Sequence, residues 1–308
     1  MAKKSKRKSE EILSFGAGFV QSRDAARVIG RVDEIADAGE DDCWLMKWTQ
    51  EEGKWAQFDL EWSATRLWIF LKPEPQLFAT GPEGRVCILT PEGSTEEIID
   101  SSDEGPTGRG PIRDLRGIGK SLFACGMGRQ VYRRAGKDRW VRADNGTLVA
   151  PGKIVLAGFN SMDGLDESDF YAVGFEGEIW RRVNEKWRQL ESPTNVILHQ
   201  VRVVKKNLVY ACGQKGVLLV GKGDEWTEIK HTATEDDLWG MQWFNDTLYV
   251  ASDDGIFALD KNSDLNAVSV KGIKTFGYLH ANDGVMWSFG LKDLIWTEDG
   301  KKWHDETP

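Results

Sequence analysis

Residues 121–134 read SLFACGMGRQVYRR, and residues 169–182 repeat the phrase as DFYAVGFEGEIWRR. Each stretch has a run of strand-forming residues, a short turn that contains glycine, and a second apolar run, which is the pattern of a β-hairpin. We expect the glycine to let the chain turn tightly. The same template fits four further segments, at residues 76–89, 208–221, 247–260 and 285–298. A hairpin that recurs along one chain indicates a repeat architecture.

A tryptophan near each of several hairpins marks a second repeated position. These tryptophans are Trp55, Trp140, Trp187, Trp226 and Trp303. From Trp140 onward the first two intervals are 47 and 39 residues, and the two longer gaps are about twice that length, with Thr95 and Leu265 where a tryptophan is expected. Seven units of roughly 40 residues result. We expect the five tryptophans to fill the space between the outer strands of neighbouring units.

Each unit also begins with an apolar stretch before its hairpin, so that a unit holds four short strands. A lone sheet of this size cannot bury both faces, whereas sheets stacked radially bury them against each other. We therefore predict an all-β protein with a single β-propeller of seven four-stranded blades at residues 11–308, after a disordered basic tail at residues 1–10. Six or eight blades are alternatives. The ring closes either with seven complete blades or by pairing an N-terminal strand with the last blade.

Several segments resemble bacterial β-propeller repeats of the WD-like, YVTN and Asp-box-like type. The similarity is carried by DLRGIGKSLFACGMGRQVYRR (114–134) and DLWGMQWFNDTLYVASDDG (237–255), and TEDGKKW (297–303) is similar to a degenerate Asp-box turn. The Gly-His and Trp-Asp pairs of true WD repeats do not recur. The resemblance implies the fold over about residues 30–305. It leaves the activity open, because propellers host enzymes, scaffolds and inhibitors alike.

Charge and hydropathy limit the classes of ligand. The chain of 308 residues carries a formal net charge of −9, and residues 1–9 hold five basic groups and no acidic one. The acidic remainder repels phosphate backbones, so nucleic acid is an unlikely partner except through the basic tail. No apolar run reaches the ~20 residues of a membrane span, and no apolar segment follows the basic start as in a signal peptide. We expect a cytoplasmic protein with no membrane partner.

Catalytic signatures are missing from the sequence. The four histidines are scattered, and neither GxSxG nor HExxH occurs. The Gly-Lys-Ser triplet at 119–121 lacks the phosphate-loop glycine five residues earlier, where Asp114 stands. The four cysteines have no metal-ligand spacing and are expected to be small buried hydrophobes. The sequence therefore predicts no enzyme and no cofactor.

One segment offers a weak calcium candidate. The stretch DKNSDLN places oxygen-bearing side chains at alternating positions, namely Asp260, Asn262, Asp264 and Asn266. It lacks the glycine and the distal glutamate of an EF-hand, and it falls where a turn is expected. Apart from this segment, we predict no metal site.

Protein binding is the function that the sequence favours. The hairpin turns and the inter-blade loops are expected to share one acidic rim, which would steer a partner with a basic surface. The candidate binding residues are Glu83, Arg129, Phe175, Glu176, Lys215, Glu235, Asp236, Asp237, Asp253, Asp254, Lys292 and Asp293. Asp103 and Glu104 add acidic groups from the long inter-blade loop at 101–114, and Asp100 adds one directly before it.

We predict a non-enzymatic, cytosolic immunity-type inhibitor of a toxin or effector protein. A general assembly scaffold is one alternative, and a glycan-binding or glycan-processing propeller is another. The glycan alternative predicts a solvent-facing aromatic cluster with neighbouring carboxylates around the central opening. The inhibitor instead predicts a closed or narrow channel, with charge spread over one rim.

Overall fold

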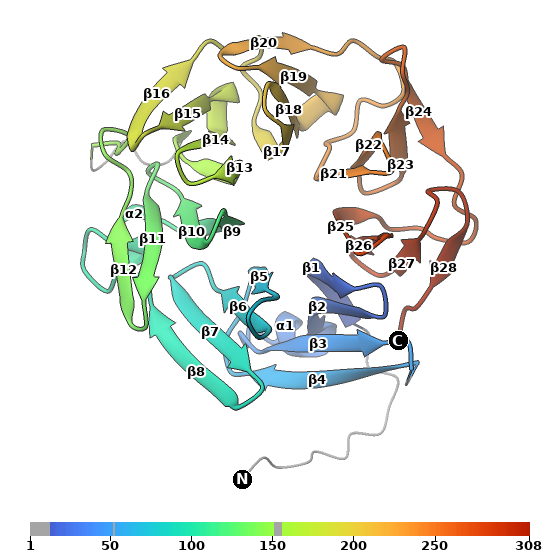
Figure 1. Cartoon of the computed structure of the whole chain (residues 1–308). Coiled ribbons are helices and arrows are strands. Elements are labelled where there is room, and N and C mark those ends of the chain that lie inside the picture. Colours follow the sequence, from blue (N-terminus) through green and yellow to red (C-terminus); the bar gives the residue numbers. More distant parts are fainter. Residues whose placement is uncertain (1–12, 52, 151–155) are drawn as a thin grey trace.

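The repeated hairpins form the second and third strands of four-stranded antiparallel sheets, which stand around a common axis (Figure 1). A computed structural model describes residues 13–51, 53–150 and 156–308, and these contain seven such sheets. Each blade is one contiguous segment whose strands, here called a to d, run outward from the axis. The predicted seven-bladed propeller is confirmed. The tail at residues 1–10 lies outside the described residues.

The first four blades include the two segments quoted at the outset. Blade 1 consists of β1 (Leu13–Ser22), β2 (Ala25–Val32), β3 (Cys43–Thr49) and β4 (Lys54–Leu60). Blade 2 consists of β5 (Arg66–Phe70), β6 (Gln76–Thr80), β7 (Arg85–Thr90) and β8 (Gly93–Ile98). Blade 3 consists of β9 (Ile112–Ile118), β10 (Ser121–Gly126), β11 (Val131–Gly136) and β12 (Arg139–Arg142). Blade 4 consists of β13 (Phe159–Asp166), β14 (Asp169–Gly174), β15 (Ile179–Val183) and β16 (Lys186–Leu190).

The remaining three blades complete the ring. Blade 5 consists of β17 (Leu198–Lys205), β18 (Leu208–Gly213), β19 (Leu218–Lys222) and β20 (Glu225–Glu228). Blade 6 consists of β21 (Gly240–Phe244), β22 (Thr247–Ala251), β23 (Ile256–Leu259) and β24 (Leu265–Val268). Blade 7 consists of β25 (Gly277–Asn282), β26 (Val285–Gly290), β27 (Leu294–Thr297) and β28 (Trp303–Asp305). The helical elements with described bounds are short turns, namely α1 (Asp33–Asp37), α2 (Pro106–Arg109), η2 (Phe175–Gly177) and η3 (Gln214–Gly216). In the described part of the chain, no helix is both long and apolar enough to span a bilayer.

The repeated glycine at the end of strand b has a different role from the one expected. Gly174 and Gly213 are extended, with φ of −174° and −169°. A Cβ at Gly174 would lie 1.8 Å from a backbone oxygen of the preceding inter-blade loop, and one at Gly213 would lie 2.2 Å from the equivalent oxygen. The glycine therefore lets two loops touch, because any side chain would hold them apart. Positive φ falls instead on turn residues such as Glu176 and Lys215.

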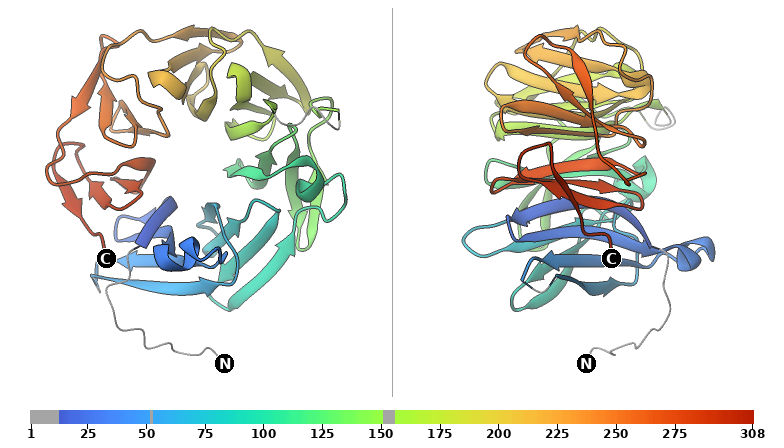
Figure 2. Two further views of the ribbon diagram at one scale, coloured as in Figure 1. Left: turned by 180° about the vertical axis from the view of Figure 1, so that it is seen from behind. Right: turned by 90° about the vertical axis from the view of Figure 1, so that its right-hand side faces the viewer.

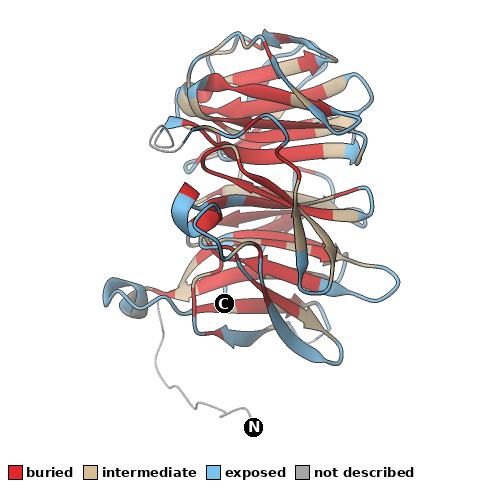
Figure 3. Cartoon of the chain, turned by 90° about the vertical axis from the view of Figure 1, so that its left-hand side faces the viewer, coloured by how far each residue is buried: buried red, intermediate tan, exposed pale blue. Residues whose placement is uncertain are grey.

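The prediction that the repeated tryptophans fill the space between blades is confirmed. The Trp187 indole N–H donates to Ala143 O of the preceding blade at 2.8 Å, and Trp55 donates to Glu306 O at 2.7 Å. The ring of Trp226 packs edge-on against Tyr171, with centroids 5.8 Å apart. Burial is concentrated in the inner and middle strands, while the outer strands and the loops are exposed (Figure 3). The core is thus a series of layers between neighbouring blades.

The ring closes between blade 7 and blade 1 without exchange of a strand, so the alternative of a shared last blade is not adopted. The C-terminus lies beside the outer strands of blade 1 (Figure 2). The Phe15 N–H donates to Leu291 O at 2.8 Å on the inner side. On the outer side, the Glu306 carboxylate accepts hydrogen bonds from the indoles of Trp48 and Trp296. Side-chain packing, hydrogen bonds and the ion pairs Arg23–Glu298 and Lys292–Asp33 therefore hold this junction, whereas each other pair of neighbouring blades is also joined by the chain.

The four cysteines are free and buried, as predicted. Burial raises the pKa of both Cys87 and Cys212 to about 12. Both thiols are therefore protonated at neutral pH and pack as small apolar groups.

A histidine in the closing interface makes stability depend on pH. The Val20 N–H donates to His280 Nδ1 at 3.1 Å, and the imidazole lies 4.0 Å from the Phe19 ring. Burial, and then the charge of Arg116, lowers the pKa of His280 to about 3. The unfolded chain takes up a proton below about pH 6.5 that the folded chain does not, so this contribution to stability is present above pH 6.5 and is lost as the pH falls below it.

Between pH 7 and pH 5, the unfolding free energy of the wild type should therefore fall by about 1–2 kcal/mol more than that of His280→Gln. This range allows for a smaller pKa difference in solution, because the imidazole is partly accessible from the channel. Urea unfolding at the two pH values measures this difference. His304→Gln, on the outermost strand of the same blade, controls for the removal of a histidine. Equal pH dependence in the wild type and His280→Gln would exclude the proposed role of His280.

Candidate functional site

The b–c turns and the d–a loops between blades lie on the same face of the ring, called the upper face below. The Lys215 N–H donates to Asp237 Oδ1 at 3.0 Å, and the Gly216 N–H donates to Asp236 O at 2.8 Å. The Phe276 N–H donates to Asp253 O at 3.0 Å. Hairpin turns and inter-blade loops therefore form one continuous rim, as expected from the sequence.

Most of the predicted binding residues expose their side chains on this rim. The exposed ones are Glu83, Glu176, Lys215, Glu235, Asp236, Asp253 and Asp254. Six of these seven are acidic, so the exposed rim carries a strongly negative charge. It attracts a basic partner at distances up to the ~8–10 Å Debye length of physiological salt.

Three other predicted residues are used inside the protein. Arg129 forms an ion pair with Glu178 at 2.6 Å, and the Glu178 side chain is only 4% exposed. Lys292 pairs with Asp33 and also donates to Ser14 Oγ at 2.8 Å. Asp293 accepts hydrogen bonds from the Thr275 N–H and hydroxyl, at 2.8 and 2.7 Å. These side chains position loops and are poorly placed to contact a partner.

Asp237 and Phe175 lie between the rim and the axis. Asp237 accepts the Lys215 N–H, and its carboxylate lies 3.6 Å from His199 Nε2. Burial lowers the pKa of His199 despite the nearby Asp237, so the ring is neutral at physiological pH. Phe175 is half-buried, with the Arg113 guanidinium 5.9 Å from its ring centroid.

The long loop between blades 2 and 3 contains α2 and two exposed acidic residues, Asp103 and Glu104. Glu104 pairs with Arg109, which is itself buried. The Asp100 carboxylate accepts hydrogen bonds from the Ser102 hydroxyl at 2.7 Å and from the Ser102 N–H at 3.0 Å. Burial alone would raise the pKa of Asp100, but these hydrogen bonds contribute to lowering it. The loop is therefore packed onto the ring and adds to the acidic rim.

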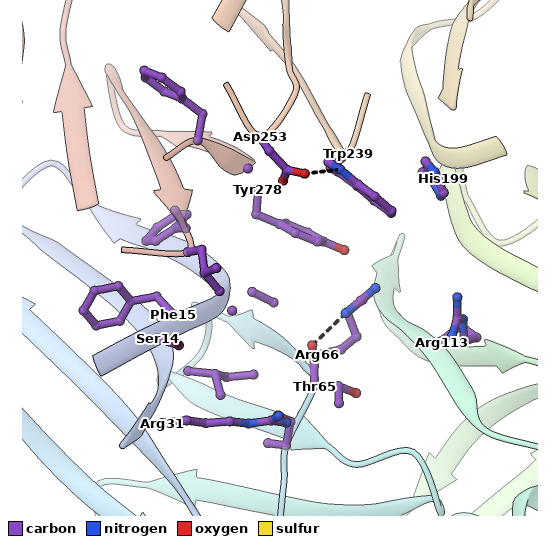
Figure 4. A pocket seen from close by; sticks show the side chains of 18 of the residues that line it. Ser14, Phe15, Arg31, Thr65, Arg66, Arg113, His199, Trp239, Asp253 and Tyr278 are labelled. Carbon is purple, nitrogen blue, oxygen red and sulfur yellow. Dashed lines mark hydrogen bonds between the residues drawn. The ribbon is translucent and has the colours of Figure 1, made fainter. Parts of the chain in front are cut away.

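A cavity of about 400 Å³, called the channel mouth below, opens at the centre of the upper face (Figure 4). Arg31, Arg66 and Arg113 reach it from blades 1, 2 and 3. Trp239 stacks on His199 with ring centroids 4.0 Å apart and donates to Asp253 Oδ2 at 3.2 Å. Among the described residues, the lining thus combines three guanidinium groups, aromatic rings and one carboxylate, that of Asp253. An acidic rim surrounds a basic centre.

The channel narrows below this mouth, to a void of about 20 Å³. The Asp163 carboxylate there pairs with Arg116 at 2.9 Å and lies 3.8 Å from Arg202. The Asp114 carboxylate accepts the N–H groups of Leu115 and Met162, both at 2.9 Å. This narrow middle agrees with the expectation for an inhibitor, although the lower end of the channel opens into a larger cavity of about 1070 Å³ lined by Trp68, Phe70 and Gln242 among others.

The calcium candidate lies at the turn between β23 and β24, on the outer edge of blade 6. Asp260 Oδ1 accepts the N–H groups of Asn262 and Asp264, at 2.8 and 2.9 Å, and Asn266 donates to Asp260 Oδ2 at 3.4 Å. The Asp260 carboxylate therefore holds its own turn. Across the described ranges, no group of three or more His, Cys, Asp or Glu side chains is placed to hold a metal ion.

Apart from Asp253, the residues of the channel mouth were not predicted. Arg66, Arg113, His199 and Trp239 all stand near the start of a strand a and are spread over more than 170 positions. The available signal was the alignment of the repeats, which places Thr65, Arg113, His199 and Trp239 at equivalent positions. These residues come together as one site only when the ring is closed.

Comparison with known proteins relates the chain to a curated protein along its whole length. It is 33% identical over 304 residues to the immune protein Tsi7 of Pseudomonas aeruginosa strain PAO1, covering 96% of this chain and 98% of that protein. The chain belongs to the Tsi7 family of immune proteins. Membership in the Tsi7 family confirms the prediction of an immunity-type protein. No family model matches the chain.

Solved structures similar to this Tsi7-family chain are other propellers. The WD40 β-propeller domain of Doa1 superposes with a TM-score of 0.69 at 10% identity, covering 94% of this chain and 95% of that one. A structure of YCF48 bound to D1 peptide gives a TM-score of 0.64 at 12% identity, covering 92% of this chain and 90% of that one. At such low identity the similarity supports the fold alone.

Proposed function

We propose that the chain neutralises a toxin or effector protein in the cytoplasm by binding it through the upper face, without catalysing a reaction. The observation that carries this proposal is the full-length similarity to the immune protein Tsi7, joined to an upper face whose exposed charged groups are mostly acidic. Fractionation of cells that produce the tagged chain tests the cytoplasmic part.

Apolar side chains on the same face supply anchors for a protein partner. Trp239 is 39% exposed beside the channel mouth, and Leu291 is 55% exposed next to it. Leu148 and Leu156, in the loop before blade 4, are also exposed. Aromatic and aliphatic anchors inside a polar rim are the usual composition of a protein interface.

The glycan alternative has one observation in its favour. Trp239 is solvent-facing and hydrogen-bonded to Asp253, which resembles part of a sugar platform. Cleavage of a glycosidic bond generally needs two carboxylates on either side of the bond, and Asp253 is the one acidic residue among the described residues that line the mouth. A growth assay distinguishes a general scaffold from an immunity protein, since a scaffold would not restore growth to intoxicated cells.

A charge-reversal variant tests the proposal. Glu83, Glu176, Glu235 and Asp254 are exposed, and their carboxylates form no hydrogen bond or ion pair with other described residues, so lysine at all four positions should leave the fold intact. The candidate partner for this assay is any toxin-like protein encoded beside the gene of this chain, purified as an inactive variant. We expect affinity to fall on the order of 10- to 100-fold, mainly through slower association and with a reduced salt dependence.

A matched control makes the same change of net charge on the lower face, with lysine at Asp24, Glu51, Glu185 and Asp246. It should bind like the wild type. Growth of cells producing the active partner is the second readout, and the chain should restore it. Failure of the wild type to bind or to protect would reject the immunity function, whereas equal loss in both variants would reject the upper face as the site.

A further inference from the structure

Three arginines at the channel mouth have no acidic partner. Within the described residues, Arg31, Arg66 and Arg113 form no ion pair, and each makes one hydrogen bond to the protein. The acceptors are Ala64 O at 3.3 Å, Thr65 O at 2.8 Å and Asn160 Oδ1 at 3.1 Å, respectively. Since a guanidinium has five N–H donors, most of the donors at this site are unused by protein groups.

Several partly buried arginines elsewhere are paired with carboxylates. Arg134 contacts the Glu97 carboxylate at 2.6 Å, and Arg181 contacts Asp169 at 2.6 Å. At the mouth, Arg66 Nε is buried without a hydrogen-bond partner and the side chain has no ion pair among the described residues, while the guanidinium lies 5.3 Å from the Tyr278 ring centroid. Partial burial, followed by the positive charge of Arg66, lowers the pKa of Arg113. The two cations therefore destabilise each other in the free protein, and a bound anion would relieve this repulsion.

The nearby acidic groups do not neutralise them. Asp114 lies deeper in the channel and accepts backbone N–H groups, as described above. Asp253, on the far side of the mouth, accepts the Trp239 indole N–H. The described residues that line the mouth therefore carry three arginines and one carboxylate around a cavity of about 400 Å³.

We propose that the channel mouth binds a single carboxylate of the partner protein, held by Arg31, Arg66 and Arg113 and flanked by Trp239 and Tyr278. This inference rests on the proposed function and adds to it one acidic group, either an Asp or Glu side chain or the C-terminal carboxylate. Planar guanidinium groups bind carboxylates in a bidentate manner, and the bond is strongest where water is excluded.

The charge pattern favours one isolated carboxylate over a nucleic-acid backbone. A polyanion that reached the mouth would have to cross the acidic rim and would be repelled there. A mainly basic protein surface pairs with that rim and can carry one acidic side chain to its centre. Such an arrangement requires a partner with basic groups opposite the rim and one acidic group opposite the channel mouth. A uniformly basic protein lacks the acidic group and would bind less well.

Small probes test the site in the free chain, without the partner. The side-chain arm is acetyl-glutamate-methylamide, with acetyl-glutamine-methylamide as its neutral control, and N-acetylglycine represents a C-terminal carboxylate. Incorporated 5-fluorotryptophan, with Trp239 assigned through Trp239→Phe, reports binding by ¹⁹F NMR. We expect one of the carboxylate probes to shift Trp239 with a dissociation constant on the order of 1–10 mM, and Arg66→Met/Arg113→Met to weaken it at least tenfold.

Arg133→Met/Arg139→Met is the matched control, because these arginines also lack an ion pair among the described residues but lie on the outer strands of blade 3. Its binding should equal that of the wild type. Arg113→Gln, a single change at an exposed side chain, is the second variant if the double variant unfolds. A Trp239 signal that stays unchanged, or that shifts equally with the glutamine probe, would overturn the proposal. Inorganic phosphate binding tenfold more tightly than the carboxylates would do so too.

Double-mutant cycles extend the test to the complex. Each acidic residue on the partner is replaced by its amide, and the C-terminus is extended by two glycines. One change should weaken binding at least tenfold to the wild type and less than threefold to Arg66→Met/Arg113→Met. If none does so while the rim variant still weakens binding, the carboxylate proposal fails and the proposed function stands.

Discussion

Trp287→Ala should destabilise the protein by about 3–5 kcal/mol, the range for large aromatic side chains removed from a core. Trp287 on β26 is fully buried, with 0% of its surface exposed. Its ring lies 5.0 Å from that of Trp48 in blade 1 and 5.8 Å from that of Phe289. Because no strand is shared and no loop joins these blades, the loss also weakens the closure of the ring. Urea unfolding monitored by far-UV circular dichroism measures the effect.

Phe170→Ala is the matched control, since Phe170 is also fully buried but lies between blades 3 and 4, which the chain connects. We expect comparable losses of global stability and different local behaviour. In hydrogen exchange, amides of β1 and β25–β28 should lose protection in Trp287→Ala well before the rest of the ring, as a cooperative local opening. Identical exchange patterns in the two variants would contradict a weak point between blades 7 and 1.

The architecture could be predicted because each repeat unit is recognisable from residues that are close together in the sequence. A hairpin with apolar alternation and a tryptophan at a fixed distance determine strand order within one blade, and seven such units leave radial stacking as the way to bury their faces. Ring closure could not be predicted in the same way. Strand exchange and complete blades need the same hairpins, and the choice depends on contacts such as Glu306 with Trp48, which are about 260 residues apart.

The candidate site was predictable on the rim and not at its centre. Turn residues such as Glu235 and Asp254 stand out in the sequence because turns are polar and exposed. Arg66 and Arg113 stand at the start of inner strands, where a single charged residue in the sequence is interpreted as pointing to solvent. They form a site only because the inner strands of blades 1 to 3 converge on the axis, which is a property of the closed ring.

The pair Glu96–Glu97 shows how alternation separates residues that look identical in the sequence. Both belong to β8, but successive side chains of a strand point to opposite faces. Glu96 pairs with Arg85 at 3.1 Å and accepts the Trp62 indole N–H at 2.8 Å, with its side chain 51% exposed. Glu97 is 1% exposed and accepts hydrogen bonds from three groups of blade 3. These donors are the guanidinium of Arg134 (2.6 and 2.9 Å), the backbone N–H of Asp138 (2.9 Å) and the indole of Trp140 (3.1 Å).

Glu97→Gln should therefore cost about 2–4 kcal/mol of unfolding free energy, because it leaves the partly buried Arg134 without its counter-ion and breaks a network between blades 2 and 3. Burial alone would raise the pKa of Glu97, but the hydrogen bonds and charge of Arg134, with those of Asp138 and Trp140, lower it below its usual value. For a carboxyl with a lowered pKa, the stabilisation is present above the unfolded-state value near 4.5 and is lost as the pH falls through the folded-state value.

The difference in unfolding free energy between the wild type and Glu97→Gln should accordingly be constant from pH 7 to pH 5 and shrink below about pH 4.5. Glu96→Gln is the neighbouring control and should cost less than about 1 kcal/mol, as exposed ion pairs do. Urea titrations at pH 7, 5 and 4 measure both variants. Equal costs for the two glutamates, or a Glu97 effect that persists unchanged at low pH, would show that the contribution of Glu97 comes from packing rather than from its charge.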